Sequence, residues 1–285
     1  MRLPKILLYS LLLLGLSLAS CRKKIKKTND QLYSRHLQSK VDLTILSTPL
    51  PEKTEKADLL ILNDGQELDA LRAALVIDSL YKKERIGALL VVAVHARNRT
   101  EDYGVAGFPD YEKRGKKAAD YDEFLEQELL PYIRKQSGIR TFNQKAIAGM
   151  SQGGLSALSF AWLHADKIDK VGVFSGSFWW RDKDQADSSY RDDQNRIMIQ
   201  MIRQSRKRPD LKYWFYYGLK EETADRDKDG VIDVADDTRD VIQALQEKKF
   251  IHPSAITLVE SAAGTHDYSS WSARFPEFLI WAFGN

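Results

Sequence analysis

The sequence predicts an α/β fold in which a mostly parallel central sheet carries helices on both faces. Short apolar runs alternate with longer amphipathic ones along the chain, as they do where crossover helices join parallel strands. No internal repeat or Pro/Gly-rich linker interrupts this alternation. The roughly 255 residues beyond the N-terminal segments are enough for one large domain with a substantial core.

The expected strands are apolar runs at 42–46, 58–62, 88–94, 146–149, 171–176, 213–218 and 255–261. Helix-like stretches lie between and after them, among others at 68–83, 121–134, 155–166 and 271–283. The last stretch places five apolar side chains on one face, as in a helix packed on a core: Trp271, Phe275, Phe278, Leu279 and Ala282. In such sheets, functional residues collect in the loops at the carboxyl ends of the strands.

The N-terminus has the layout of a secretory signal. "MRLPKILLYSLLLLGLSLASC" combines a basic start, an apolar run and small residues before a cysteine. The run is shorter than the ~20 apolar residues of a membrane-spanning helix. Its end resembles the lipobox of bacterial lipoproteins, and Cys21 is the only cysteine. We therefore expect a lipoprotein signal peptide at 1–20 and a lipidated Cys21 that holds the chain at an extracytoplasmic membrane surface of the bacterial cell envelope. A plain secretory signal is the alternative.

Positive charge is concentrated at the N-terminus, within and directly after this signal. Seven basic residues and no acid precede Thr28, while the remaining chain holds 36 basic and 40 acidic residues. Residues 21–40 are therefore expected to form a basic tether against anionic headgroups, or a solvated linker, and 41–285 the globular domain. The slightly acidic body argues against a nucleic-acid partner.

One strand-to-helix junction carries the pattern G-x-S-x-G of a nucleophile elbow. Gly149, Ser151 and Gly153 lie between a short apolar strand and an amphipathic helix. The glycines leave room for the crossing backbones, and the tight turn exposes the serine hydroxyl. The start of the helix points the amide of Gln152 at the same place, where it suits an oxyanion.

A serine needs a base, and in chains with this elbow the order is serine, acid, histidine. Of five histidines, His266 follows the last expected strand and precedes the final helix. His95 ends a strand before the serine, and His164 lies on the helix after it. We therefore expect His266 to be the base, with a helix-capping histidine as the alternative.

Together with the elbow, four stretches resemble the esterase D and enterochelin esterase branch of the α/β-hydrolases, which includes the antigen 85 acyltransferases and feruloyl or acetyl-xylan esterases. The stretches are "LILNDGQ", "NRTEDYG", "PDYEKRGKKAADYDEFLEQELLPYI" and "GTHDYSSWSARFPEFLIW". The resemblance implies an α/β-hydrolase fold, a second oxyanion amide from Gln66 and a catalytic acid at Glu221. Glu222 is adjacent, and the sequence does not separate the two.

Acidic residues then alternate in a loop of the EF-hand type. Asp225, Asp227, Asp229, Gly230, Asp233 and Asp236 fall at positions 1, 3, 5, 6, 9 and 12, with the Val231 carbonyl at position 7. Asp236 departs from the usual glutamate, and a strand precedes the loop instead of a helix. This calcium-type loop (225–236) predicts a structural calcium ion, the alternative being a solvated acidic turn.

Aromatic residues at Phe178, Trp179 and Trp180 follow the next strand, where they line a sugar or aryl pocket or pack in the core.

Taken together, these features predict a serine esterase that acts through an acyl-enzyme on a small-molecule, carbohydrate or siderophore-type ester, without a catalytic cofactor. An acyltransferase of the same fold is a close alternative. A non-catalytic binding lipoprotein that retains the fold is the alternative from another class.

Overall fold

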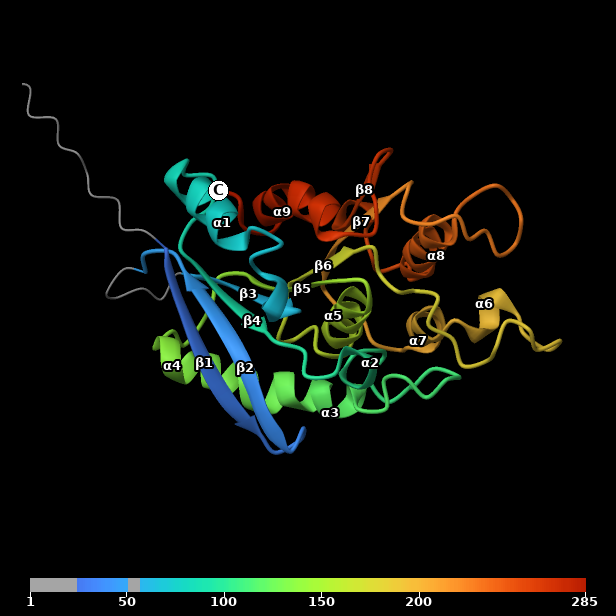
Figure 1. Cartoon of the computed structure of the whole chain (residues 1–285), viewed down its shortest axis with the longest axis horizontal. Helices are drawn as coiled ribbons and strands as arrows, with labels where there is room; N and C mark the ends of the chain where they lie inside the picture. The colour runs from blue at the N-terminus through green and yellow to red at the C-terminus, as the bar shows by residue number, and fades with distance from the viewer. Residues whose placement is uncertain (1–24, 51–56) are drawn as a thin grey trace, which may run out of the picture.

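The computed structural model describes residues 25–50 and 57–285, which contain one eight-stranded sheet with helices on both faces (Figure 1). The strands are β1 (Lys26–Ser34), β2 (Ser39–Ser47), β3 (Asp58–Asn63), β4 (Leu89–Val94), β5 (Lys145–Met150), β6 (Lys170–Phe174), β7 (Lys212–Gly218) and β8 (Ile256–Ser261). Their order across the sheet is β1-β2-β4-β3-β5-β6-β7-β8. The β1–β2 and β2–β4 pairs are antiparallel and the others are parallel, which confirms the predicted mostly parallel sheet.

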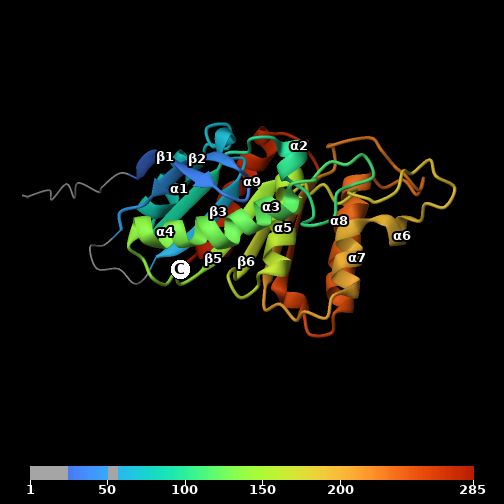
Figure 2. The same ribbon diagram turned by 90° about the horizontal axis from the view of Figure 1, so that it is seen from below.

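Two sets of helices cover the sheet (Figures 1 and 2). One face packs on α1 (Ala73–Lys82) and α9 (Tyr268–Phe283), and the other on α3 (Ala118–Glu123), α4 (Leu130–Ser137), α5 (Gln152–Leu163), α7 (Ile197–Gln204) and α8 (Asp233–Glu247). Shorter segments are α2 (Arg99–Asp102), α6 (Asp192–Asn195), the 3₁₀ turns η1 (Gly65–Glu67) and η3 (Pro253–Ala255), and the π-helical η2 (Phe124–Leu129) that joins α3 to α4.

The core is divided by the sheet because side chains alternate along each strand. Leu59 and Ile61 of β3 belong to one hydrophobic cluster, whereas Leu60 and Leu62 belong to the other. All four are buried, as expected for a central parallel strand that is covered on both sides. The predicted apolar face of α9 is also confirmed, since all five of its residues are at most 5% exposed.

The predicted tether is wrong from Lys26 onward, because residues 26–34 form β1 and pair with β2 along their whole length. This strand lies at the edge of the sheet and is mostly exposed, so it needs no apolar pattern. The expected signal peptide at 1–20 and Cys21 lie outside the described residues. Within the described ranges, no helix has both the length and the apolar character to cross a membrane.

The fold gathers polar residues at one edge of the sheet. Parallel strands end at the same edge, so the loops after β3, β5, β6, β7 and β8 meet there. These loops carry Asp64, Ser151, Ser175, Glu221 and His266 in turn.

Candidate active site

Ser151 lies in the sharp turn between β5 and α5. Its backbone has φ 54° and ψ −123°, a conformation that L residues rarely adopt and that must be held by its surroundings. A Cβ added at Gly149 would lie 2.3 Å from the carbonyl of Gly153, so the first glycine of the elbow permits the crossing of strand and helix. The N–H of Ser151 donates to the carbonyl of Phe174 in β6 at 2.9 Å, which fixes the turn against the neighbouring strand.

Glu221 and His266 are hydrogen-bonded. Oε2 of Glu221 lies 2.8 Å from Nδ1 of His266, while Oε1 accepts from the N–H of Gly218 and the hydroxyl of Ser175, both at 2.6 Å. The Glu221 side chain is 1% exposed and that of His266 is 41% exposed. A buried carboxylate with these donors is well satisfied, and it holds the imidazole of a residue that remains accessible.

Glu222 turns away from this pair. Its Oε1 accepts from the N–H of Val234 at 2.7 Å and so caps the first turn of α8. Burial, with the neighbouring negative charges of Asp233 and Asp237, raises the pKa of Glu222 above its usual value. Of the two glutamates that the sequence left unseparated, the geometry therefore pairs Glu221 with His266.

A cavity of about 500 Å³ opens over these residues. It is lined by Arg99, Ser151, Gln152, Ser175, Gly176, Ser177, Trp179, Glu221, Glu222, Val234 and His266. Among the residues described, the hydrogen-bond partner of Ser151 Oγ is Ser177 Oγ, at 3.2 Å, and the N–H of Ser177 donates to the Ser151 carbonyl. Serine and histidine thus face one cavity without contacting each other, and such contacts often form only with a bound substrate.

The two expected oxyanion amides lie on neighbouring segments. Gln152 is the first residue of α5 and lines the cavity. Gln66 lies in η1, outside the lining of that cavity, and its side chain accepts from the N–H of Ala96 at 3.0 Å and donates to Asp64 at 3.1 Å. The structure thus positions the Gln66 loop after β3, beside the elbow after β5.

An ion pair fixes that loop to the elbow. Asp64, with φ 61°, is 2% exposed, and its carboxylate accepts from Nε of Arg99 at 2.7 Å and from Nη2 at 3.1 Å. Arg99 Nη2 also reaches the carbonyl of Met150, one residue before Ser151, at 3.4 Å. A Cβ at Gly153 would lie 2.7 Å from Asp64, so the second glycine of the elbow lets this carboxylate approach.

The other histidines have partners elsewhere. His164 contacts Asp122 at 2.6 Å on the far end of α5, and His252 caps η3 through its contact with Ser254. His95 contacts the hydroxyl of Thr44 at 2.8 Å, and burial lowers the pKa of His95. The three aromatic residues after β6 take different positions. Phe178 and Trp180 are fully buried in the core, whereas Trp179 lines the cavity.

Three of the proposed calcium ligands converge. Asp225, Asp227 and Asp229 each present a carboxylate oxygen within 4.8 Å of the other two. Gly230 at position 6 has φ +94°, as the sharp turn of such a loop requires. The N–H of Val231 donates to Asp229 at 2.8 Å, which gives the loop a defined turn before α8. An all-oxygen donor set of this kind fits the ligands that calcium prefers.

The last two proposed ligands lie on α8. Asp233, its first residue, accepts from the N–H of Arg226 at 2.7 Å and is also 3.4 Å from that guanidinium. Burial raises the pKa of Asp236 to about 6, and the negative charges of Asp229 and Asp227 add to the effect. Neither belongs to the group of converging carboxylates, and Asp233 is engaged by Arg226.

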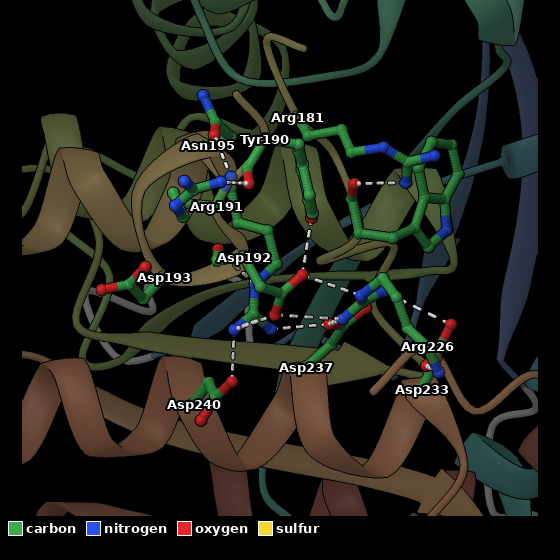
Figure 3. A network of polar contacts seen from close by, with 12 residues as sticks. Arg181, Tyr190, Arg191, Asp192, Asp193, Asn195, Arg226, Asp233, Asp237 and Asp240 are labelled. Carbon is green, nitrogen blue, oxygen red and sulfur yellow. Dashed lines mark hydrogen bonds and ion pairs between the residues drawn. The ribbon is translucent and has the colours of Figure 1, made fainter. Parts of the chain in front are cut away.

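Arg226 also anchors the calcium-type loop to the protein interior (Figure 3). Its guanidinium contacts Asp237 of α8 at 2.5 Å and Asp192 of α6 at 2.7 Å. Arg196 contacts the same oxygen of Asp237 at 2.6 Å, and it also pairs with Asp192 and Asp240. Two guanidinium groups thus share one carboxylate that is 1% exposed, and this network joins the loop, α6, the start of α7 and α8.

Comparison with known proteins identifies the family of this chain. The model of a family described as putative esterase matches residues 34–282, almost the whole described domain. The chain belongs to the putative esterase family. Membership supports the activity class that the sequence predicts, hydrolysis of carboxylic esters. A curated relative of this esterase is an uncharacterised protein of Bacillus subtilis, YbbA, which is 21% identical over 78% of this chain and 84% of its own.

Solved structures of related fold are esterases as well. An enterobactin esterase from Shigella flexneri superposes with a TM-score of 0.68 at 20% identity, covering 90% of this chain and 59% of its own length. A ferulic acid esterase matches with a TM-score of 0.65 at 18% identity over 91% of this chain and 98% of its own. A siderophore hydrolase from Aspergillus nidulans matches with a TM-score of 0.64 at 16% identity, over 88% of this chain and 93% of its own. These similarities establish the α/β-hydrolase fold of this esterase.

Sequence reasoning missed several residues of the esterase site. Arg99, Ser175 and Ser177 line the cavity, and none of them was selected from the sequence. Ser175 and Ser177 directly follow β6, the neighbour of β5 in the sheet. Their place at the carboxyl end of a strand beside the elbow was the available signal. Arg99 lies in the stretch "NRTEDYG", which by itself predicts no role for the arginine.

Proposed function

We propose that this esterase hydrolyses a carboxylic ester through Ser151 as nucleophile, His266 as general base and Glu221 as the carboxylate that orients the base. The observation that carries the proposal is the 2.8 Å contact between Glu221 and His266 in the cavity that also exposes Ser151. The chain order of serine, acid and histidine is the order of α/β-hydrolases.

The chemistry follows from the donors and acceptors of these groups. An ionised Glu221 only accepts, so Nδ1 of His266 carries the proton and Nε2 is free to accept the Ser151 proton. The serine oxygen then bonds to the ester carbonyl carbon, and the carbonyl oxygen takes the negative charge. The amides of Gln152 and Gln66 are the proposed donors to that oxyanion. The imidazolium returns its proton to the leaving alcohol, and water cleaves the acyl-enzyme by the same steps.

The substitution Ser151→Ala tests this proposal. Loss of the attacking oxygen should lower kcat for an aryl acetate by several orders of magnitude, as nucleophile deletions do. The matched control is Ser189→Ala, an exposed serine in the loop before α6, which should keep normal turnover. Ser151→Ala with more than a tenth of the wild-type activity would exclude the assignment.

The proposed substrate is a small-molecule ester with polar, aromatic or siderophore-like groups. Solved relatives include an enterobactin esterase crystallised in the presence of enterobactin and a ferulic acid esterase. The cavity combines the aromatic wall of Trp179 with the polar groups of Arg99 and Glu222. Because the chain spans only 59% of the enterobactin esterase, that substrate is not assumed here. Comparing kcat/KM for catechol, feruloyl and simple acyl esters tests this proposal.

We also propose that calcium binds the calcium-type loop. Asp225, Asp227 and Asp229 would hold the ion with the Val231 carbonyl and Asp236, and Asp233 would contribute through water. A divalent cation there would offset the repulsion among the aspartates and order the loop that follows Glu221 and Glu222. Its role is structural, because the proposed acyl transfer needs no metal.

A lipid anchor at Cys21 is the proposed means of localisation, on the extracytoplasmic side of the envelope. The proposal depends on the lipobox-like sequence and the single cysteine. Cys21→Ser should move the protein from the membrane fraction to the soluble fraction without changing its specific activity. Equal membrane association of the variant would contradict the anchor.

A further inference from the structure

Ser175 combines burial with a rare backbone conformation that its neighbours hold in place. It follows β6 directly, is fully buried, and has φ 49°, in the left-handed region that a serine seldom occupies. Its N–H donates to the carbonyl of Tyr216 in β7 at 2.7 Å, which keeps the residue in register with the neighbouring strand. Such conformations persist only where the surrounding structure enforces them.

The side chain of Ser175 links the indole of Trp271 to Glu221. Trp271 Nε1 lies 2.9 Å from Ser175 Oγ, and Ser175 Oγ lies 2.6 Å from Glu221 Oε1. An indole N–H can only donate, so it occupies a lone pair of the hydroxyl. The hydroxyl proton is then directed to the carboxylate, so Ser175 accepts from Trp271 and donates to Glu221.

Trp271 also contacts the base. Its ring meets the imidazole of His266 edge to face, with centroids 5.1 Å apart and an interplanar angle of 79°. Trp271 is 5% exposed in the first turns of α9, the helix that begins two residues after His266. One buried side chain therefore supports both the base, by ring contact, and the acid, through Ser175.

We propose that Ser175 and Trp271 are positioning residues that set the orientation of Glu221 toward His266. Ser175 and the Gly218 N–H both donate to Oε1 of Glu221. These two hydrogen bonds fix the orientation of the carboxylate, so that Oε2 points toward His266. The inference rests on the proposed function, because it assigns Ser175 and Trp271 a role through the proposed acid. In the proposed mechanism, neither residue touches the reacting atoms.

The first test separates orientation from folding. Ser175→Gly removes the hydroxyl and relieves the left-handed backbone, which offsets part of the cost of leaving the Trp271 N–H and Glu221 Oε1 without this partner. The protein should therefore stay folded with a modestly lower melting temperature. Turnover should nevertheless fall by ~10–100-fold, the value of a hydrogen bond to a charged group, with KM changed less than about twofold. Unchanged kcat in Ser175→Gly would overturn the proposal.

Trp271→Phe tests the indole donor with a matched control. It removes the N–H but keeps most of the aromatic surface, and kcat should fall by ~3–10-fold. The control is Trp214→Phe, because Trp214 is also buried but its Nε1 has no hydrogen-bond partner among the described residues. Trp214→Phe should keep the wild-type kcat. Equal losses in both variants would reduce the role of Trp271 to packing and overturn the proposal.

A double-mutant cycle with Glu221→Gln shows whether Ser175 acts through the acid. If it does, Ser175→Gly should lower kcat by less than about twofold when Glu221 is already replaced. If the loss of kcat in the double variant equals the product of the losses in the two single variants, the inference is contradicted.

The downfield proton resonance of the His266–Glu221 hydrogen bond gives a readout that needs no substrate. It should shift or broaden in Ser175→Gly and Trp271→Phe and stay unchanged in Trp214→Phe. An unchanged resonance in all three variants would overturn the proposal even in an active enzyme. Conversely, if these variants shift the resonance but the wild type hydrolyses no ester, the proposed function is excluded and the positioning role remains.

Discussion

Oε2 of Glu221 lies 2.8 Å from Nδ1 of His266, although the two residues are 45 positions apart in the chain. The acid is buried and held by two further donors, whereas 41% of the histidine side chain is exposed to the cavity. A fixed acid beneath an accessible base is the arrangement that selects one imidazole tautomer.

Exchanging each glutamate in turn should separate their roles. Glu221→Gln is expected to lower kcat by ~10²–10⁴-fold, since the imidazole then loses its preferred tautomer and orientation. Glu222→Gln should change kcat far less, because Glu222 caps α8 at Val234 and does not contact His266. Steady-state kinetics on an aryl acetate measure both. The reverse ranking would show that the acid is Glu222.

Calcium should stabilise the protein through the calcium-type loop. At a calcium concentration 100 times Kd, the free energy of unfolding should rise by about 2.7 kcal/mol. A chelator should lower the melting temperature, increase proteolysis near Arg226 and Lys228, and reduce kcat more than it raises KM, because a loosened loop misplaces Glu221.

The double variant Asp227→Ala, Asp229→Ala should remove the calcium response. Its control, Asp184→Ala with Asp187→Ala, changes net charge equally in an exposed acidic loop outside the calcium-type loop and should retain the response. A wild-type melting temperature that is indifferent to both chelator and added calcium would leave the stretch as an acidic turn.

Loss of the shared carboxylate at Asp237 should strongly destabilise the fold. Asp237→Asn removes the buried carboxylate that Arg196 and Arg226 share and leaves the two guanidiniums with the more exposed Asp192, Asp233 and Asp240. Because these partners remain, the cost should lie near the low end for a broken buried ion pair, about 3 kcal/mol of unfolding free energy. Urea denaturation should show a lower midpoint. Asp240→Asn is the control: that carboxylate is 40% exposed, and its loss should cost under about 1 kcal/mol. Similar midpoints for both variants would contradict the role of the buried network.

His164 should make stability depend on pH. Burial by itself would lower the pKa of His164, but the hydrogen bond and charge of Asp122, with Glu126, raise it above its usual value. Because the folded pKa is raised, this stabilisation is complete below the unfolded value of about 6.5 and disappears as the pH rises through the folded pKa. The destabilisation caused by Asp122→Asn should therefore be larger at low pH than at high pH.

Melting temperatures of the wild type and Asp122→Asn between pH 5 and 9, a span of about 4 units around the histidine value, check this prediction. Asp69→Asn is a suitable control, because it removes an exposed carboxylate whose partner, Lys27, is not a histidine. A pH-independent difference for Asp122→Asn would contradict the assigned role of His164.

The sheet and the elbow were predictable because they depend on local patterns. Apolar runs such as Leu89–Val94 are buried on both faces, and the elbow needs glycines at fixed offsets from Ser151. β1 was not predictable in this way, since an exposed edge strand has no apolar period. The charge of this segment instead predicts a tether.

Within the site, the sequence could indicate which loops carry functional residues but not which atoms meet. Glu221 and Glu222 are neighbours of identical chemistry, and only the arrangement of Gly218, Ser175 and α8 separates them. The Ser175–Trp271 contact joins residues 96 positions apart, and no local pattern predicts it.

Covalent labelling of the full chain with a fluorophosphonate tests the central claim most directly, because it detects a reactive serine without requiring the natural substrate. We expect one adduct per chain in the intact mass, located by peptide mapping on Ser151, absent from Ser151→Ala and formed much more slowly in His266→Gln. A wild type that stays unlabelled, or an adduct that persists at another residue in Ser151→Ala, would contradict the claim.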